Sequence, residues 1–457
     1  MNHTQNFDVI IIGGGFSGAI TAINLLNRAE QNINIGLINH NAPLSKGIAY
    51  STEEPYHLLN VPAGKMSAFP DKPNDFIHWL AQHPDFKNND DLSGIFVPRK
   101  VYGEYIQFLL SAQIESSHSK LEVIKDEAIE IQGNANSSYS IQLKSQPVPL
   151  ESKHIVLALG NALPYNLLQK YGFNENTTDY ISNPWDFNKI KNIPQHKDIF
   201  IIGSGLTTVD LLLTLKHNKH QGKINILSRH GLLPKAHEPY EPVTIAHDIK
   251  SFSSCLASLS YMKSQLKKNT SWRAVIDSIR PVTQDIWLHW STKEKARFLK
   301  HLRAYWDVHR HRIAPQIMQS IQELIKANQV NVKAGNITGA SLIDSQFKIS
   351  YIAKHNNEPK QVSADYVINA TGPNYISYLN HPLVKSLVEQ NLTGWDEFKL
   401  GFNTNKNSLL MNDQSEMAKN LYAIGPLTKS TFWEIIAVPD IRGQAAAVTH
   451  SILSNLR

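Results

Sequence analysis

Cysteine is nearly absent from this sequence, with Cys255 as the single cysteine among 457 residues. One cysteine cannot form an internal disulfide or supply a pair of redox-active thiols, so the chain needs no oxidising compartment. The sequence also has no apolar run close to the roughly 20 residues of a membrane span, and no basic segment typical of a secretory signal precedes its first apolar residues. We therefore expect a cytoplasmic protein that does not enter a membrane.

An excess of either charge is missing too. Lysine and arginine number 45 against 39 aspartate and glutamate residues, and the formal net charge of +6 is spread along the chain. This is too little for nucleic-acid binding unless the charge is clustered. Hydrophobic residues make up 42% of the chain, which excludes disorder as the main state. At about 150 residues per domain, the length predicts three globular units, or two with a large insertion.

A glycine-rich turn lies near the N-terminus, between an apolar run at residues 7–12 and a helical pattern that continues to residue 26. The turn comprises Gly13, Gly14, Gly15, Phe16, Ser17 and Gly18. In this strand, turn and helix context Gly13 permits the tight turn, and Gly15 lets a pyrophosphate approach the backbone. Gly18 lets the helix lie close to the strand. The segment is predicted to bind a dinucleotide.

A second turn of this kind follows an apolar strand at residues 199–202 and precedes another helical pattern. It comprises Gly203, Ser204, Gly205, Leu206, Thr207 and Thr208. Thr208 replaces the third small residue, and we expect it to loosen the approach of the helix to the strand. Each turn leads into a second strand, and Asn39 and Arg229 lie at its end, both 26 positions past the first glycine (39 − 13 and 229 − 203). Two dinucleotide units of one geometry are therefore predicted.

The residue at the end of that second strand faces the adenosine ribose and so selects the nucleotide. In the second unit Ser228 and Arg229 provide a hydroxyl and a guanidinium, which suit a 2′-phosphate, and no carboxylate for a 2′-hydroxyl. We therefore predict that the second unit binds NADPH in preference to NADH. The alternative is that Arg229 is a solvated loop residue. In the first unit Asn39 stands where a carboxylate is usual for FAD, although an amide can also bind a ribose.

These residues resemble the flavoproteins with two dinucleotide-binding folds, in which an FAD domain is interrupted by an NAD(P) domain. Five further segments are similar to bacterial FAD/NAD(P)-binding oxidoreductases that include some urate hydroxylases: residues 47–52, 57–63, 96–99, 425–427 and 439–442. The resemblance implies an α/β fold with two Rossmann-like domains, and FAD and NADPH as cofactors. We expect residues 1–163 and 364–457 to form the FAD domain, and residues 164–363 to form the NAD(P) domain.

Apolar strands bracket the interrupting domain. The strand at 156–160 ends at Gly160, and the strand at 365–373, interpreted as part of the returning FAD domain, contains Gly372. The second also resembles a signature of flavin N-hydroxylases, from which Asn369 and Pro373 depart. We interpret it as a domain crossover and not as evidence for amine substrates.

Other residues are predicted to contact FAD. Arg99, at the start of a helix, is either a cation for the FAD pyrophosphate or a surface residue. Residues 121–132 and 139–143 are expected to form a small sheet that carries the adenine, with Ala128 beside it. Gly425 precedes Pro426, where many relatives have a Gly-Asp pair that holds the ribityl chain. The helix from about residue 441 either directs its N-terminus at the flavin or is an ordinary terminal helix.

Between about residues 248 and 324 strand patterns disappear and helical patterns dominate. On the helix at 292–309, Phe298, Leu302, Tyr305 and His309 recur at helical spacing and predict one largely apolar stripe. This helical insertion is expected either to pack on the main body or to cap a substrate pocket, with residues 309–312 facing an anion or the NADPH phosphates. No metal site is expected, because His309 and His311 point to different faces of a helix.

The cofactors determine the expected chemistry: NADPH reduces the flavin, which passes electrons onward. The single cysteine excludes disulfide substrates reached through a protein dithiol. Our first hypothesis is a monooxygenase that hydroxylates a small organic substrate with O2. The alternatives are an NADPH-dependent reductase that uses another acceptor, and a flavin-binding redox sensor. We assign no catalytic side chain, because the flavin performs the bond chemistry.

Overall fold

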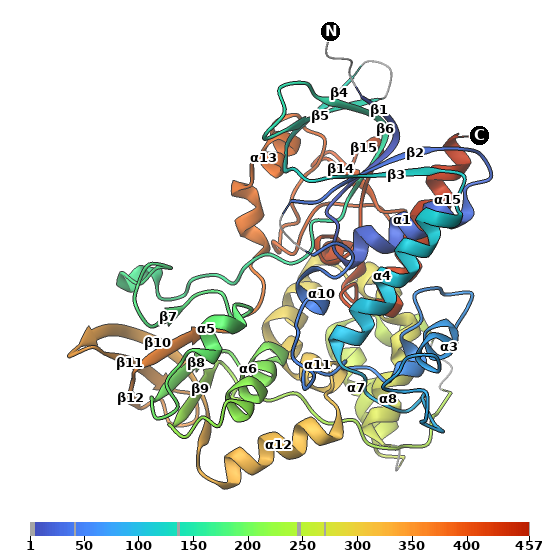
Figure 1. The fold of residues 1–457 in the computed structure, drawn as a ribbon. Helices are drawn as coiled ribbons and strands as arrows, with labels where there is room; N and C mark the ends of the chain where they lie inside the picture. Colours follow the sequence, from blue (N-terminus) through green and yellow to red (C-terminus); the bar gives the residue numbers. More distant parts are fainter. Residues whose placement is uncertain (1–4, 41–42, 135–137, 245–247, 269–270, 457) are drawn as a thin grey trace.

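Two sheets, each the centre of one domain, and a group of helices beside them make up the protein (Figure 1). The structure is a computed structural model that describes residues 5–40, 43–134, 138–244, 248–268 and 271–456. No helix within these ranges combines the length and the apolar composition needed to cross a membrane.

The first sheet is assembled from both ends of the chain, in the order β14–β15–β6–β1–β2–β3, with β5 also paired to β6 and β4 to β5. Its strands are β1 (Asn6–Ile12), β2 (Asn34–Ile38), β3 (Lys120–Ile124), β4 (Ala128–Gly133), β5 (Tyr139–Leu143), β6 (Leu150–Leu157), β14 (Leu409–Met411) and β15 (Met417–Ala423). The five strands from β15 to β3 are parallel. Their apolar runs show little alternation, because both faces of a parallel sheet are covered.

Two layers cover the first sheet. Helices α1 (Phe16–Arg28), α4 (Arg99–Ser116) and α15 (Val438–Leu456) bury the apolar side chains of one face. The β4–β5 pair and α13 (Pro382–Glu389) cover the other. The small sheet expected from residues 121–132 and 139–143 is therefore split. β3 extends the parallel sheet beside β2, and only β4 and β5 form the antiparallel layer. The polar composition of residues 133–138 predicts a hairpin loop, but residues 135–137 lie outside the described residues.

The second sheet has the order β12–β11–β10–β9–β8–β13–β7. Its strands are β7 (Tyr180–Ile181), β8 (Ile199–Ile202), β9 (Ile224–Ser228), β10 (Val330–Ile343), β11 (Gln346–Ala353), β12 (Pro359–Ala364) and β13 (Tyr366–Asn369). Helices α5 (Phe187–Lys191), α6 (Leu206–His217) and α12 (Pro315–Lys326) pack on one face. The antiparallel strands β10 to β12 project away from the body of the protein (Figure 1).

Strand β13 corrects one expectation. The apolar run at 365–373 was predicted to begin the returning FAD domain, but β13 pairs with β8 and β7 in the second sheet. The chain returns to the first sheet only after Pro373. That crossover lies against the outgoing one, because Pro373 forms a bridge with Pro164 and the Asn374 amide donates to the Leu163 carbonyl at 3.1 Å. A short apolar run fits either parallel sheet equally well, so its pattern does not select one.

The segment between β9 and β10 of the second sheet is largely helical, as predicted. It contains α7 (Cys255–Leu266), α8 (Trp272–Ile279), α9 (Thr283–His289), α10 (Thr292–Arg297), a π-helical turn (Phe298–Leu302) and α11 (Arg303–Arg310). These helices pack on the C-terminal part of the first domain, where Trp287 stacks on Trp433 with ring centroids 4.7 Å apart. The Trp287 indole also donates to the Ser430 carbonyl at 2.7 Å.

The π-helical turn changes the predicted apolar stripe. Phe298 and Leu302 face the apolar core, but the next core residue is Trp306, whereas Tyr305 is exposed. A π turn contains an extra residue, so every later side chain is displaced around the helix axis by about one position. The prediction of Tyr305 as a stripe residue is therefore wrong.

Short elements complete the fold and carry several segments of the site. They are α2 (Gly47–Tyr50), α3 (Asp75–Leu80), α14 (Lys429–Phe432) and the 3-10 turns Ala63–Lys65, Gln169–Tyr171, Ile249–Phe252, Arg280–Val282, Tyr375–Asn380 and Pro426–Thr428.

Candidate functional site

The two glycine turns have nearly the same backbone. Gly13 and Gly203 adopt φ values of 109° and 111°. A Cβ atom would lie 2.3 Å from the Ala158 carbonyl oxygen at Gly13, and 2.1 Å from the Ala370 carbonyl oxygen at Gly203. Both the positive φ and the close approach require glycine. The predicted equivalence of the two turns therefore extends to the strand on which each turn packs, β6 in the first domain and β13 in the second.

The two units have different residues at the third small-residue position of the glycine turn, Gly18 in the first and Thr208 in the second. A Cβ atom at Gly18 would lie 1.8 Å from the Gly13 carbonyl oxygen, so the first helix approaches its strand through glycine. In the second unit the buried Thr208 hydroxyl donates a 2.8 Å hydrogen bond to the Gly203 carbonyl. Thr208 thus joins the helix to the first glycine of its turn.

Both helices that follow the turns begin in a way that suits a phosphate. Gly15 and Gly205 are the N-cap residues of α1 and α6. Within the described chain, neither helix has a side-chain cap or an acidic residue in its first turn. By contrast, Asp186 caps the nearby α5. Uncapped amide groups and the positive end of the helix dipole bind anions. The residues of both units therefore fit a dinucleotide pyrophosphate.

The residues predicted to contact the two riboses lie at the ends of β2 and β9. Asn39 lies against Gly14, where a Cβ atom would come within 2.8 Å of the asparagine side chain. In the second unit Ser204 donates to the Ser228 hydroxyl at 2.8 Å. Arg229 is exposed and has no ion-pair partner among the described residues.

A lysine from a distant strand joins this place. The Lys354 ammonium lies 2.6 Å from Nδ1 of His230, the residue after Arg229. Lys354 follows the projecting strand β11, so no local sequence pattern connects it with the second glycine turn. We therefore add Lys354 to the basic groups beside the predicted 2′-phosphate position.

The remaining predicted FAD residues lie in different surroundings. Gly425, at φ 76°, lies against Ser17 of the first turn, since a Cβ atom would be 2.6 Å from the serine hydroxyl. Its amide donates to the side chain of Gln444 in α15 at 2.8 Å, and no local sequence pattern links these two residues. Gly160 and Gly372, at φ 76° and 86°, each lie two residues past the carbonyl on which a glycine turn packs. Ala128 is buried in the layer formed by β4, β5 and α13.

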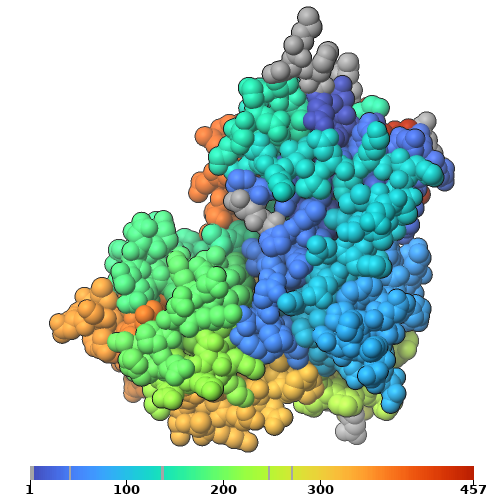
Figure 2. All heavy atoms as spheres, viewed as in Figure 1, coloured from blue at the N-terminus to red at the C-terminus, as the bar shows by residue number. Residues whose placement is uncertain are grey.

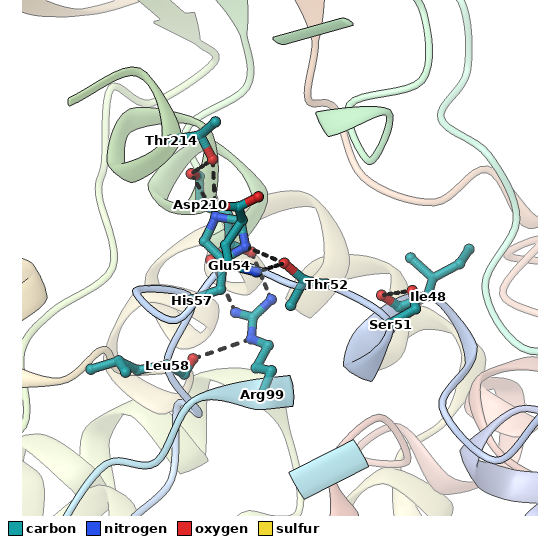
Figure 3. Close-up of polar contacts among 9 residues, drawn as sticks. All are labelled: Ile48, Ser51, Thr52, Glu54, His57, Leu58, Arg99, Asp210 and Thr214. Carbon is teal, nitrogen blue, oxygen red and sulfur yellow. Dashed lines mark hydrogen bonds and ion pairs between the residues drawn. The ribbon is translucent and has the colours of Figure 1, made fainter. Parts of the chain in front are cut away.

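Arg99 has a protein partner that the sequence did not predict. Its guanidinium forms two hydrogen bonds with Asp210 of α6, at 2.7 and 3.1 Å, and a third with the Leu58 carbonyl at 3.1 Å (Figure 3). The side chains of Arg99 and Asp210 are only 17% and 6% exposed. Arg99 is therefore not a surface residue, and its charge is paired with that of Asp210, although it also lines the cavity described below. It joins the two domains, and the sequence does not reveal this because Asp210 lies 111 positions away.

His57 completes this junction between the domains. Its Nδ1 lies 2.8 Å from the Thr52 hydroxyl and its Nε2 lies 3.0 Å from the Thr214 hydroxyl of α6 (Figure 3). Burial lowers the pKa of His57, which favours the neutral ring. Figure 2 shows the blue residues of the first domain in contact with the green residues of the second. Segments 47–52, 57–63 and 96–99, which carry the family resemblance, thus contribute to the domain junction.

We expect Arg99→Leu to lower the free energy of unfolding by about 3–5 kcal/mol, because it leaves the buried Asp210 carboxylate without its cation. Urea unfolding followed by tryptophan fluorescence measures this loss. The double variant Arg99→Leu/Asp210→Leu should lose much less than the sum of the two single variants. Strictly additive losses would show that the two side chains are not coupled.

A cavity of about 1440 Å³ lies between the two domains and the helical insertion. From the second domain it is lined by residues 203–207 and 228–230, and from the first by residues 48–50 and 436–438. Residues 48–50 directly follow Gly47, which contacts Gly15 of the first turn. The helix α15 begins at Val438, slightly before the predicted start at about residue 441, and its N-terminus lies at the cavity.

The helical insertion both packs on the body and lines this cavity. Its basic run is largely matched by acidic partners: Arg310 lies 3.1 Å from Glu434, and Arg312 pairs with Asp277. Both arginines also line the cavity, so they lie where the second alternative placed them, but each has an acidic partner of its own. His311 and Glu434 lie 4.0 Å apart.

Comparison with known proteins supports the fold and the expected cofactors. Residues 10–162 match a family model described as FAD-NAD(P)-binding. No match to a curated protein was found. An ornithine N-hydroxylase from Kutzneria sp. 744 superposes with a TM-score of 0.69 at 13% identity, over 99% of this chain and 100% of that chain. L-lysine 6-monooxygenase from Pseudomonas syringae superposes with a TM-score of 0.68 at 14% identity, over 99% of this chain and 100% of that chain.

Reductases share the architecture with lower similarity. The bacillithiol disulfide reductase of Staphylococcus aureus gives a TM-score of 0.57 at 15% identity, over 99% of this chain and 100% of that chain. These matches confirm the predicted α/β fold with two Rossmann-like domains and the resemblance to flavoproteins of this architecture.

Proposed function

We propose that this protein is an FAD-dependent NADPH oxidoreductase that hydroxylates a small organic substrate with O2. The observation that carries the proposal is the shared cavity. The second glycine turn opens into it, and the first turn adjoins its wall through Gly47. Two dinucleotides bound at these turns would therefore meet at one place. The similarity to ornithine and lysine hydroxylases supports hydroxylation as the reaction class.

In this mechanism the protein binds and orients, and the cofactor supplies the redox chemistry. Residues 13–18 with Asn39 and Gly425 would hold FAD, and residues 203–207 with Ser228 and Arg229 would hold NADPH. Bound there, FAD would supply the redox chemistry that couples the oxidation of NADPH to the reduction of O2. The helical insertion lines one side of the cavity and would limit the access of water to the reacting groups from that side.

A reductase with another electron acceptor is the second candidate, favoured by the structural similarity to the bacillithiol disulfide reductase. Cys255 argues against a thiol mechanism. Its side chain is buried in the core of the helical insertion, and burial raises the pKa of the thiol. A buried thiol with a raised pKa is a poor nucleophile. As a buried free thiol it also agrees with a cytoplasmic location.

One experiment tests the proposed function. The purified protein is expected to show a flavin absorption spectrum that NADPH bleaches under nitrogen and that air restores. NADPH oxidation in air should consume O2, and a substrate should accelerate it. Turnover with a quinone but without O2 consumption would favour the reductase. A colourless protein that binds no added FAD would refute both candidates.

Arg229→Ala tests the choice of nucleotide. A charge-assisted contact to the 2′-phosphate contributes roughly 1.5–3 kcal/mol, so NADPH affinity should fall about 10- to 150-fold. NADH has no such phosphate and should be affected little. Flavin reduction measured against the concentration of each nucleotide decides this. An equal loss for both nucleotides would mean that Arg229 is only a loop residue.

A further inference from the structure

A buried cation at the cavity has no acidic partner in the part of the chain that the structure describes. Lys429 is 8% exposed and lines the cavity, yet its ammonium forms no ion pair or hydrogen bond within the described part of the chain. Its contact there is with an aromatic ring, because the ammonium lies 4.5 Å from the centroid of Trp433. A buried ammonium without an anion is costly, so such groups are rare outside binding sites.

The neighbouring charges leave this cation unmatched. Arg310 is paired with Glu434, and Arg303 lies 3.5 Å from Asp307. Arg303 also lines the cavity and approaches the same Trp433 ring, with its guanidinium carbon 5.8 Å from the centroid. Two cations from different domains are thus held close together around one tryptophan. After the acidic partners are matched, the charge of Lys429 remains.

The backbone supports a functional role for this place. Arg303 directly follows the π-helical turn, and Lys429 begins the short helix α14, which Trp433 follows as its C-cap residue. Trp433 adopts φ 47° and ψ −66°, a strained conformation for a side chain of this size. Strain of this kind persists only where the surroundings enforce it, and it is frequent at functional sites.

We propose that Lys429 and Arg303 form a subsite for a carboxylate or an equivalent oxyanion, so that the substrate is a small organic anion. This inference rests on the proposed function and specifies its substrate class. An anion at the subsite would neutralise the charge of Lys429 and accept hydrogen bonds from both cations. The subsite lies next to the segment from Gly425 to Thr428, which contacts the first glycine turn, so a bound anion would be held beside the proposed FAD site.

The acid–base properties of Lys429 agree with this subsite. Burial, followed by the nearby positive charge of Arg303, lowers the pKa of Lys429 to about 8. Asp307 and Glu434 act in the opposite direction, and His311 also faces the ammonium. Since only the protonated amine attracts an anion, anion affinity should fall as the pH rises above about 8.

Calorimetric titration with two matched pairs of probes tests the proposal: benzoate against benzamide, and acetate against acetamide. The members of each pair have nearly the same shape but differ in charge. At pH 7 a carboxylate is expected to bind to the FAD-loaded protein at least about 10-fold more tightly than its amide. Lys429→Met should weaken the carboxylate about 10- to 150-fold and leave the amide unchanged.

Two further variants separate a binding role from a structural one. Lys429→Arg should restore most of the carboxylate affinity and move its loss to a higher pH. Lys120→Met removes the same charge from an exposed position outside the cavity and should change nothing. If neither carboxylate binds more tightly than its amide, or if Lys429→Met leaves carboxylate binding intact, the subsite is wrong.

Two other outcomes have distinct meanings. If Lys429→Met weakens NADPH or FAD and not the carboxylate, the lysine serves a cofactor and the proposal is overturned. If the protein fails to bind FAD but still binds a carboxylate through Lys429, the proposed function fails while the anion subsite stands.

Discussion

Gly15→Val is expected to abolish FAD binding and with it all NADPH-dependent activity. Gly15 is the N-cap residue of α1, and its backbone is extended, with φ −72° and ψ −168°. Among the described residues, a Cβ atom there would meet only Gly47, with its nearest atom at 3.4 Å. The methyl groups of valine would therefore extend into the space in front of the uncapped amides, where the pyrophosphate is expected. The flavin content of the purified variant, read from its absorption spectrum, measures the effect.

Gly15→Ala provides the graded control. Its single methyl group lies at ordinary contact distance from Gly47, so the variant should fold and retain part of its FAD. Circular dichroism of all three proteins distinguishes loss of FAD from loss of fold. A fully flavinated Gly15→Val protein would contradict the assignment of the first unit to FAD.

Gly205→Val is expected to produce the reciprocal result: a yellow protein that NADPH no longer reduces, with the rate lowered by at least about 100-fold. A Cβ atom at Gly205 would meet no atom within 4 Å among the described residues, and this residue lines the cavity. The added side chain should therefore leave the protein fold unstrained and occupy the space of the nucleotide pyrophosphate. Stopped-flow measurement of flavin reduction under nitrogen gives the rate.

Reduction by dithionite is the matching control for Gly205→Val. Dithionite needs no nucleotide site, so it should bleach the flavin of the variant as readily as that of the unaltered protein. Normal reduction by NADPH in Gly205→Val would mean that the donor binds elsewhere. Together the two valine variants test whether the two glycine turns serve different cofactors.

Local patterns in the sequence were sufficient to predict both dinucleotide units. Strands β1 and β8, the glycine turns and the helices α1 and α6 lie where the pattern placed them, with small differences at their ends. The reason is that these elements depend on neighbours in the chain. Gly13 and Gly203 need a positive φ for the turn, and the apolar runs on either side have the periods of a buried strand and a helix. The helical insertion was predicted for the same reason.

The sequence alone did not determine which distant residues meet. Strand β13 joined the second sheet, since an apolar run of four residues fits either sheet. The π turn displaced the apolar stripe from Tyr305 to Trp306, because one extra residue in a turn has no clear mark in the pattern.

Pairing between charges was decided only by the tertiary structure. Arg99 pairs with Asp210 and Arg310 pairs with Glu434, whereas Lys429, which lines the cavity, has no acidic partner among the described residues. The physical reason is that the effect of a buried charge depends on its partner and on the exclusion of water, and both come from segments far apart in the chain. The sequence therefore determined the two strand, glycine turn and helix units. The packing of the domains determined which charges are paired and which are unpaired in the cavity between them.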